Sequence, residues 1–169
     1  CHLSDIHFAI NGNTILEKQE KLCNAILQDA LKKDIIIFIV SGDIAQSGQA
    51  NEYEIAYNFF TEIQEYLEMK KEIRVLFFFA PGNHDCDFSD DQKNKDDDLR
   101  REKVINEREK ITEDELSYYI EALCQKQQEY RDFVDVFGYD DIEGVQVKLL
   151  SRSKLLTQYE VKVEGKEIK

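Results

Sequence analysis

The stretch Ile73-Arg74-Val75-Leu76-Phe77-Phe78-Phe79-Ala80-Pro81-Gly82-Asn83-His84-Asp85 joins an apolar run to a polar turn. The run over 73–80 predicts a β-strand buried on both faces of a sheet. The end of such a strand is the carboxyl edge of the sheet, where open α/β folds bind their ligands. Gly82 permits a sharp turn and a close approach to a ligand. Asn83, His84 and Asp85 offer an amide oxygen, an imidazole and a carboxylate, although such residues are also typical of ordinary polar turns.

Two other stretches repeat this pattern of an apolar run followed by polar residues. The run over 35–40 predicts a second buried strand and leads into Asp43. Residues 1–4 predict the end of a third strand and lead into Asp5 and His7. We therefore expect three strand ends to deliver Asp, Asn and His side chains to one edge of a sheet. Oxygen and imidazole ligands of this kind suit Mn, Fe or Zn.

The length and composition predict a globular protein with one domain over 1–169. Apolar residues make up 42% of the chain and charged residues 34%, and the formal net charge is −13. This charge disfavours a protein that grips nucleic acid through its general field, although bound divalent metals would reverse the sign locally. We find no apolar segment of membrane-spanning length and no signal peptide, and we expect a cytoplasmic protein without membrane contact.

The cysteines are far apart in the sequence and form no C-x-x-C pair. A disulfide framework or a zinc knuckle is therefore not indicated, and we expect reduced thiols. They are Cys1, Cys23, Cys86 and Cys124.

Two segments with helical periodicity lie between the three expected strands. Thr14 and Glu17 predict a capping box at the start of the first helix. Asn51 and Glu54 predict the N-terminal cap of the second, whose buried stripe runs through 53–67. The resulting order is β-α-β-α-β, which predicts parallel strands and an α/β fold.

The segment 87–140 is rich in charged residues and predicts an acidic helical insertion lying beside the sheet. Within it we expect a solvated loop, a charged helix and a long amphipathic helix that starts at a capping box and stops at a glycine. These features cover 87–98, 99–110 and 116–137, with the capping box at Thr112 and Glu115 and the stop at Gly138.

The last part of the chain changes to an alternating pattern. Residues 145–150 and 159–163 alternate apolar and polar side chains, which predicts strands with one face in water. Glu164 and Gly165 predict a hairpin turn after the second of these strands.

Three ordered motifs, Asp5-x-His7, Gly42-Asp43 and Gly82-Asn83-His84-Asp85, resemble the calcineurin-like metallophosphoesterase superfamily. The wider strings over 3–8 and 42–48 resemble its phosphodiesterase branch. The resemblance implies a β-sandwich flanked by helices, with a two-metal site at the strand ends. We expect this fold to be incomplete on its C-terminal side.

The resemblance also implies roles for individual residues. Asp5 and His7 would bind a first metal, Asp43 would bridge both metals, and Asn83 would bind the second. His84 would lie near the leaving group as a proton donor or an electrostatic stabiliser, and Asp85 would orient His84. We expect two divalent metal ions, Mn²⁺ first, with Fe or Zn as alternatives. Such a pair lowers the pKa of a bound water and absorbs charge on the phosphoryl oxygens.

The sequence departs from the family pattern after His84. The family supplies further metal-binding histidines from two later motifs, one of them Gly-His-x-His, whereas this sequence contains only His2, His7 and His84. Either the chain is the first part of a longer polypeptide or the later motifs have been lost. We expect the rest of a longer polypeptide, and we expect the chain alone to be catalytically impaired. His2 lies within the strand, and we expect it to be structural.

Two functions from different classes remain in competition. The first is metal-dependent hydrolysis of a phosphoester, expected to be a phosphodiester within a nucleotide or nucleic acid. The alternative is a non-catalytic regulatory or scaffold module that retains the metallophosphoesterase fold. A doubly wound nucleotide-binding domain is disfavoured because no glycine-rich phosphate loop is present. The oligomeric state is left open by the sequence.

Overall fold

A computed structural model describes residues 1–169 with the exception of 31–32, 72, 140–143, 155 and 164–169. The chain divides into two compact units. Unit 1 comprises Cys1–Asp90 and Lys126–Phe137, and unit 2 comprises Asp91–Gln125 and Gly138–Lys169.

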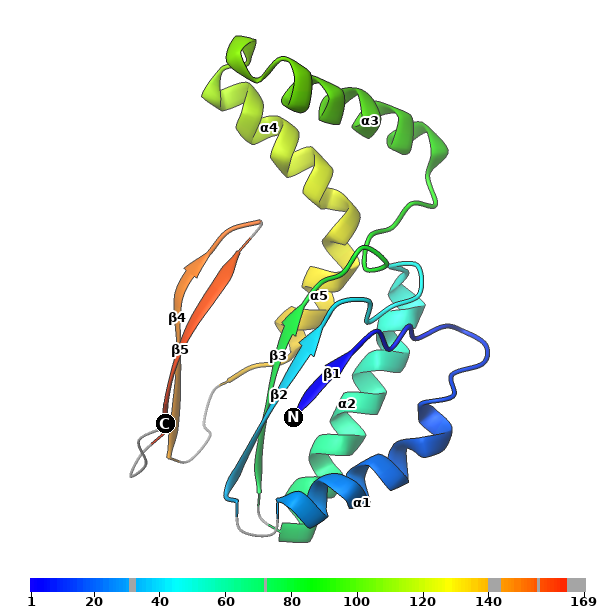
Figure 1. The fold of residues 1–169 in the computed structure, drawn as a ribbon, viewed down its shortest axis with the longest axis vertical. Helices are drawn as coiled ribbons and strands as arrows, with labels where there is room; N and C mark the ends of the chain where they lie inside the picture. The colour runs from blue at the N-terminus through cyan, green and yellow to red at the C-terminus, as the bar shows by residue number, and fades with distance from the viewer. Residues whose placement is uncertain (31–32, 72, 140–143, 155, 164–169) are drawn as a thin grey trace. The chain divides into compact units, whose positions relative to one another are not determined.

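Unit 1 is built on a three-stranded parallel sheet with the strand order β1-β2-β3 (Figure 1). The predicted β-α-β-α-β order and the parallel pairing are therefore confirmed. The elements are β1 (His2–Ser4), η1 (Leu16–Lys18), α1 (Gln19–Asp29), β2 (Ile35–Ser41), α2 (Ala50–Lys71), β3 (Arg74–Ala80) and, later in the chain, α5 (Gln128–Val136).

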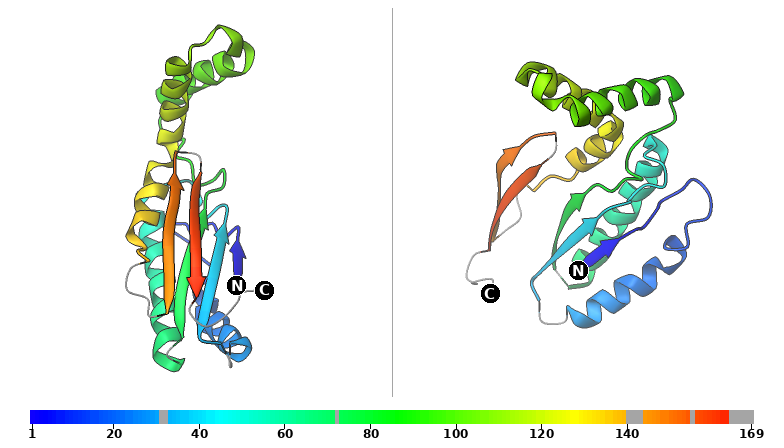
Figure 2. Two further views of the ribbon diagram at one scale, coloured as in Figure 1. Left: turned by 90° about the vertical axis from the view of Figure 1, so that its left-hand side faces the viewer. Right: turned by 45° about the horizontal axis from the view of Figure 1, so that its top comes forward.

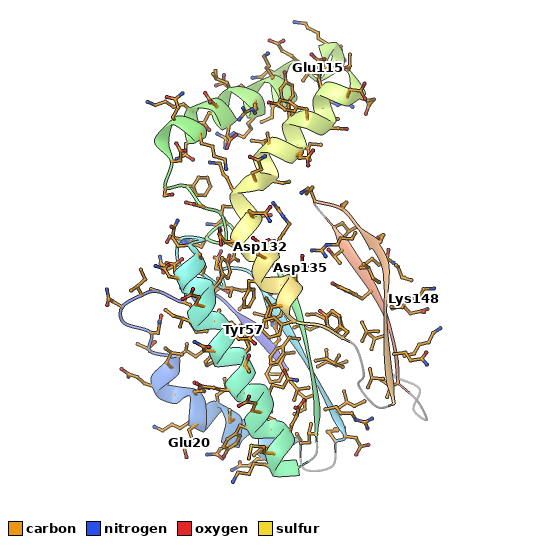
Figure 3. The ribbon with its side chains drawn as sticks, turned by 180° about the vertical axis from the view of Figure 1, so that it is seen from behind. Glu20, Tyr57, Glu115, Asp132, Asp135 and Lys148 are labelled. Atoms are coloured by element: carbon orange, nitrogen blue, oxygen red, sulfur yellow. The ribbon has the colours of Figure 1, made fainter. Side chains whose placement is uncertain are left out.

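The core of unit 1 lies between the sheet and its helices. Figure 3 shows α2 and α5 over one face of the sheet, with Tyr57 on α2 and Asp132 on α5. Phe60 of α2 and Phe133 of α5 are buried in this core, and the Phe79 ring of β3 lies 5.0 Å from the Phe133 ring. The end of the predicted helical insertion thus belongs to the core of unit 1.

Burial on both faces, predicted for the two long strands, is wrong for β2. Its burial alternates along the strand, and Ile39 is 45% exposed. Phe38 and Val40, which point to the helical side, are fully buried. The continuous apolar run hid this alternation because every residue in it is hydrophobic.

Two predicted helix caps are also wrong. No side-chain cap precedes η1 or α1, so the expected box at Thr14 is absent. Helix α2 begins at Ala50, so Asn51 lies inside its first turn. The carboxylate of Glu52, not of Glu54, accepts hydrogen bonds from the amides that precede the helix, those of Ser47 and Gln49. The positions of the free amides in this loop determine which acidic side chain accepts their hydrogen bonds at the start of the helix.

Unit 2 contains two helices that pack as a hairpin, α3 (Asp91–Asn106) and α4 (Glu113–Cys124), with the short η2 (Arg108–Lys110) between them (Figure 2). The predicted capping box is confirmed: Thr112 Oγ1 accepts from the Glu115 amide, and Glu115 accepts from the Thr112 amide. These bonds from the Thr112 amide and hydroxyl lower the pKa of the Glu115 carboxyl.

The structure corrects the predicted boundaries of the acidic segment. Residues 91–98, expected to be a loop, belong to α3, where ion pairs one turn apart support the helix, such as Arg101 with Asp98 at 2.9 Å. The predicted long helix over 116–137 is interrupted by η3 (Gln125–Gln127), which separates α4 from α5.

The end of unit 2 is an antiparallel hairpin of β4 (Val145–Arg152) and β5 (Thr157–Val163) (Figure 2). The two predicted strands are confirmed, whereas the turn predicted at 164–165 lies outside the described residues. Among the helices that the structure describes, none has the length and apolar character needed to cross a membrane.

Candidate metal centre at the carboxyl edge of the sheet

The loops that follow β1 and β2 continue side by side beyond the ends of these strands. The amide of Asp5 donates to the Gly42 carbonyl at 3.2 Å, and the amide of His7 donates to the Asp43 carbonyl at 2.9 Å. An isolated parallel bridge then joins Phe8 to Ala45. These backbone bonds set the two loops at the carboxyl edge of the sheet, as expected from the sequence.

Three side chains from three different strand ends converge at this edge. One potential ligand atom each from His7, Asp43 and His84 lies within 4.8 Å of the others. Asp43 stands between the histidines: its Oδ2 lies 3.9 Å from His7 Nε2, and its Oδ1 accepts a hydrogen bond of 2.9 Å from the His84 amide. The two imidazole rings meet edge to face with their centroids 4.7 Å apart. The arrangement is a compact set of two imidazoles and one carboxylate.

The backbone around this cluster adopts an unusual conformation. Asp5, His7 and Asp43 have φ angles of 53°, 55° and 50°, and within the described part of the chain they are the non-glycine residues with positive φ. Left-handed backbone at non-glycine residues costs roughly 1–3 kcal/mol each and tends to gather at functional sites. All three are residues that the sequence singled out as metal ligands.

Gly82 lies so close to Asp43 that no side chain fits at position 82. A Cβ atom there would collide with the Asp43 amide nitrogen and carboxylate oxygen, and would lie 2.9 Å from Asp43 Cγ. The turn after β3 can therefore approach the carboxylate closely, which brings His84 to the cluster. The need for glycine was predicted, and the group approached is the carboxylate of Asp43.

Asp85 is fully buried and holds the loops together. Its carboxylate accepts hydrogen bonds from the amides of Ile44 at 3.2 Å, Ala45 at 2.9 Å and Gly82 at 2.8 Å. The Tyr53 hydroxyl donates a fourth bond at 2.9 Å. Burial, followed by the neighbouring Asp85 carboxylate, raises the pKa of the Tyr53 phenol. Asp85 thus fixes the backbone on both sides of the cluster.

The expectation that Asp85 orients His84 is corrected by these contacts. The Nδ1 atom of His84 lies 2.7 Å from the Gln46 carbonyl oxygen. Because a carbonyl only accepts hydrogen bonds, Nδ1 carries the proton and Nε2 is left with its lone pair in the neutral ring. The bonds of the Asp85 carboxylate go to backbone amides and Tyr53 instead.

The remaining predicted site residues lie at the margin of the cluster. Among the residues that the structure describes, the carboxylate of Asp5 is not part of the three-residue group, although its amide is tied to the neighbouring loop. Asn83 is exposed and lines a pocket beside His84. His2 is exposed, its Nε2 lies 2.7 Å from the Ser41 hydroxyl, and it is not a member of the three-residue group found among the described residues.

The chemistry of the cluster fits a divalent transition metal. Among the residues that the structure describes, His7 Nδ1 is buried and has no hydrogen-bond partner, which leaves this ring nitrogen available to a further ligand. The Gln46 carbonyl on His84 Nδ1 fixes the tautomer and the orientation of that ring. Two imidazoles and a carboxylate suit Mn, Fe or Zn.

Sequence reasoning missed two groups that shape the site. The partner of His84 is the main-chain carbonyl of Gln46, for which a sequence carries no signal. Tyr53 was assigned to the apolar stripe of α2, and its ring is buried there as expected. A buried tyrosine ordinarily finds a partner for its hydroxyl, and this rule could have indicated the bond to Asp85.

The comparisons with known proteins agree with the geometry of the loops. Residues 1–163 match the family model described as calcineurin-like phosphoesterase. No curated protein and no solved structure gives a significant match to the sequence.

Proposed function

Because the chain belongs to the calcineurin-like phosphoesterase family, we propose that the edge of its three-stranded sheet carries the metal site of a phosphodiester hydrolase. The family is one of metal-dependent hydrolysis of phosphoesters. The choice of a phosphodiester, within a nucleotide or a nucleic acid, is our extension of that activity and follows from the strings over 3–8 and 42–48.

The observation that carries this proposal is the convergence of His7, Asp43 and His84 within 4.8 Å. The three residues come from three separate motifs and reach one another only because the strand ends are parallel and adjacent. A chance surface cluster would not require left-handed backbone at His7 and Asp43.

We assign the metal-holding roles within this frame. Asp5 and His7 would hold one divalent ion, Asn83 would hold another, and Asp43 would contact both, with Mn²⁺ as the expected metal. Bound divalent ions would activate water as the nucleophile and stabilise charge on the phosphoryl oxygens. The central position of Asp43, between the His7 ring and the His84 amide, supports its shared role.

The chain's own groups then supply orientation and proton transfer. His84 presents Nε2 because its Nδ1 proton is held by the Gln46 carbonyl. Once protonated, Nε2 can donate its proton to the departing oxygen of the ester. Asp85 acts as a positioning residue, since it holds two amides that follow Asp43 and one amide that precedes His84.

Metal stoichiometry and hydrolysis together test the proposal. Purified chain is titrated with Mn²⁺ by calorimetry, and hydrolysis of bis(4-nitrophenyl) phosphate is followed with and without EDTA. Asp43→Asn should weaken Mn²⁺ binding at least tenfold and remove metal-dependent hydrolysis, while the exposed control Asp132→Asn behaves as the wild type. Hydrolysis that persists in EDTA, or Mn²⁺ binding insensitive to Asp43→Asn, contradicts the proposal.

A non-catalytic metal-binding module is the second candidate. It is favoured by the composition of the described cluster, in which two histidines and one aspartate suffice for a single ion. One bound Mn²⁺ per chain with no hydrolysis would support this candidate, and two ions with hydrolysis would support the two-metal enzyme.

A further inference from the structure

A pocket adjoins the metal centre on the side of His84. It has a volume of about 500 Å³, which lies within the range of small-molecule sites, and it is formed by the loops that follow β2 and β3. Its lining combines amides and hydroxyls with one aromatic ring and the imidazole, and includes Gln46, Ser47, Gln49, Asn83, His84 and Phe88.

The lining indicates which part of a substrate the pocket can hold. Among the described residues, no Asp, Glu, Lys or Arg side chain lines it. A groove for a nucleic-acid strand carries cations along its length to meet successive phosphates. A neutral lining with amides and an aromatic ring fits instead one uncharged, planar, hydrogen-bonding group attached to a phosphate at the metal centre.

The backbone that carries Phe88 is firmly anchored. The amide of Asp87 donates to the Lys126 carbonyl at 2.8 Å, and the Asp87 carboxylate accepts from Gln49 Nε2 and from the Ser89 amide, each at 2.8 Å. Gly48 presses against the same turn, where a Cβ atom would lie 2.8 Å from the Asp87 nitrogen. Phe88 is thus presented from a preorganised turn, which reduces the entropy lost on binding.

The ring of Phe88 is itself held in place. The ammonium of Lys126 lies 4.7 Å from its centroid, over the ring, and Lys126 is 8% exposed. Phe88 nevertheless remains 58% exposed. A fixed and exposed aromatic ring that lines the same pocket as the His84 imidazole is suited to stacking against a planar group.

We propose that Phe88 is the stacking platform of a subsite that binds the nucleobase of the leaving group. This inference rests on the proposed function, which places the scissile phosphate at the metal centre. The departing nucleoside extends from His84 over Phe88, and the side-chain amide of Gln46 faces the polar edge of its base. The substrate is then a nucleotide-sized phosphodiester, in which one base is read beside the scissile bond.

Binding measurements test this subsite without requiring turnover. The 169-residue chain, in the presence of Mn²⁺, is titrated by calorimetry with 5′-AMP and with ribose 5-phosphate, which lacks the base. We expect tighter binding of 5′-AMP. Phe88→Ala should weaken 5′-AMP at least about fivefold, as expected for loss of a stacked base, and should leave ribose 5-phosphate unchanged.

Two further variants test whether the effect of Phe88→Ala comes from the loss of a stacking ring. Phe88→Trp should retain or strengthen 5′-AMP binding, because indole also stacks, and Tyr118→Ala, which removes an exposed aromatic ring from α4, should have no effect. Equal affinity of the wild type for the two probes overturns the proposal, and so does Phe88→Ala weakening both probes alike. Absence of any 5′-AMP binding to the wild type overturns it as well.

The outcome is separable from that of the proposed function. If binding depends on the base and on Phe88 but the chain shows no metal-dependent hydrolysis, the nucleobase subsite is supported and the proposed hydrolase activity is contradicted. If the chain hydrolyses bis(4-nitrophenyl) phosphate but binds 5′-AMP no more tightly than ribose 5-phosphate, the subsite is contradicted and the proposed hydrolase activity is supported.

Discussion

Tyr53 donates its hydroxyl proton to Asp85 across 2.9 Å, and both side chains are buried. The bond connects helix α2 to the loops that present Asp43 and His84. Because Asp85 also holds three backbone amides, the geometry of the candidate metal centre depends on a residue outside the three-residue cluster.

Asp85→Asn should destabilise unit 1 and disorder the metal centre. Asparagine keeps one oxygen and replaces the other by an amide group, which cannot accept from the backbone donors. Losing two bonds to a charged acceptor costs about 3–6 kcal/mol. We expect a loss of this size in the free energy of unfolding by urea, with weaker Mn²⁺ binding. The exposed Asp132→Asn should change stability by less than about 0.5 kcal/mol, and an Asp85→Asn chain equally stable to that control would refute the role.

Tyr53→Phe should alter stability at alkaline pH. The folded-state pKa of Tyr53 lies above its ordinary value of 10.0, chiefly through burial and then through Asp85. The folded state therefore keeps the phenol proton when the unfolded chain begins to lose it. The stability from this group is complete below about pH 10 and falls as the pH rises above that value.

The wild type should consequently lose unfolding free energy more steeply above pH 10 than Tyr53→Phe does, in denaturant titrations at successive pH values. At neutral pH the same variant should be less stable by about 1.5–3 kcal/mol, since the bond to the carboxylate is lost. Tyr118→Phe, at an exposed tyrosine, should follow the wild-type profile. Parallel curves for wild type and Tyr53→Phe would speak against the buried bond.

Gly82→Ala should disrupt the site through one methyl group. Its Cβ would collide with the Asp43 backbone and carboxylate, so the turn after β3 must move away. We expect Mn²⁺ affinity to fall at least tenfold, measured by calorimetry. Gly138→Ala is the matched control, because a Cβ there meets no atom within 4 Å. Unchanged affinity in Gly82→Ala would mean that the close approach is not needed.

Asp5→Gly should stabilise the chain in EDTA and weaken its binding of Mn²⁺. Glycine relieves the left-handed backbone at φ 53°, which is worth about 1 kcal/mol, while the proposed ligand oxygen is removed. Asp5→Asn separates the effects, since it keeps a side chain and removes the charge. Thermal unfolding in EDTA and in Mn²⁺ measures both quantities, and a destabilised Asp5→Gly chain in EDTA argues against stored strain.

His84→Asn should slow the hydrolysis of substrates with poor leaving groups more than that of substrates with good ones. Proton donation matters for an alkoxide and little for 4-nitrophenolate, which departs as an anion. We expect a loss of about 10²–10⁴-fold in kcat/KM for thymidylyl-(3′→5′)-thymidine and a smaller loss for bis(4-nitrophenyl) phosphate. Equal losses on both substrates would assign His84 to metal or phosphate binding instead of proton donation.

The elements that the sequence predicted well are those with a strong pattern. The three parallel strands, most of the stripe of α2 and the capping box at Thr112 follow from periodicity and local hydrogen bonding, and the structure confirms them. Tyr57, which was expected in the buried stripe, is instead 39% exposed. The caps at Thr14 and Asn51 failed because the same residue spacing occurs by chance and only the local backbone decides whether a side chain reaches a free amide.

The candidate site also has parts that were predictable from the sequence and parts that were not. Ordered motifs at the strand ends predicted that His7, Asp43 and His84 would meet, since adjacent parallel strands end at one edge. The partner of His84 and the amides on Asp85 were beyond prediction, because main-chain groups are identical at every residue and only the folded loops select among them. The polar composition of 91–98 is typical of a loop, whereas ion pairs one turn apart, such as Arg101 with Asp98, support a helix there.

The hydrogen bond between the Asp87 amide and the Lys126 carbonyl closes a long excursion of the chain. The segment between them, which includes α3 and α4, leaves unit 1 and returns to it at one place. Doubling the length of such a loop costs only about 0.6 kcal/mol of closure entropy. Evolution can therefore lengthen, shorten or exchange this segment while the strand ends keep their positions, which makes it the natural place for related chains to diverge.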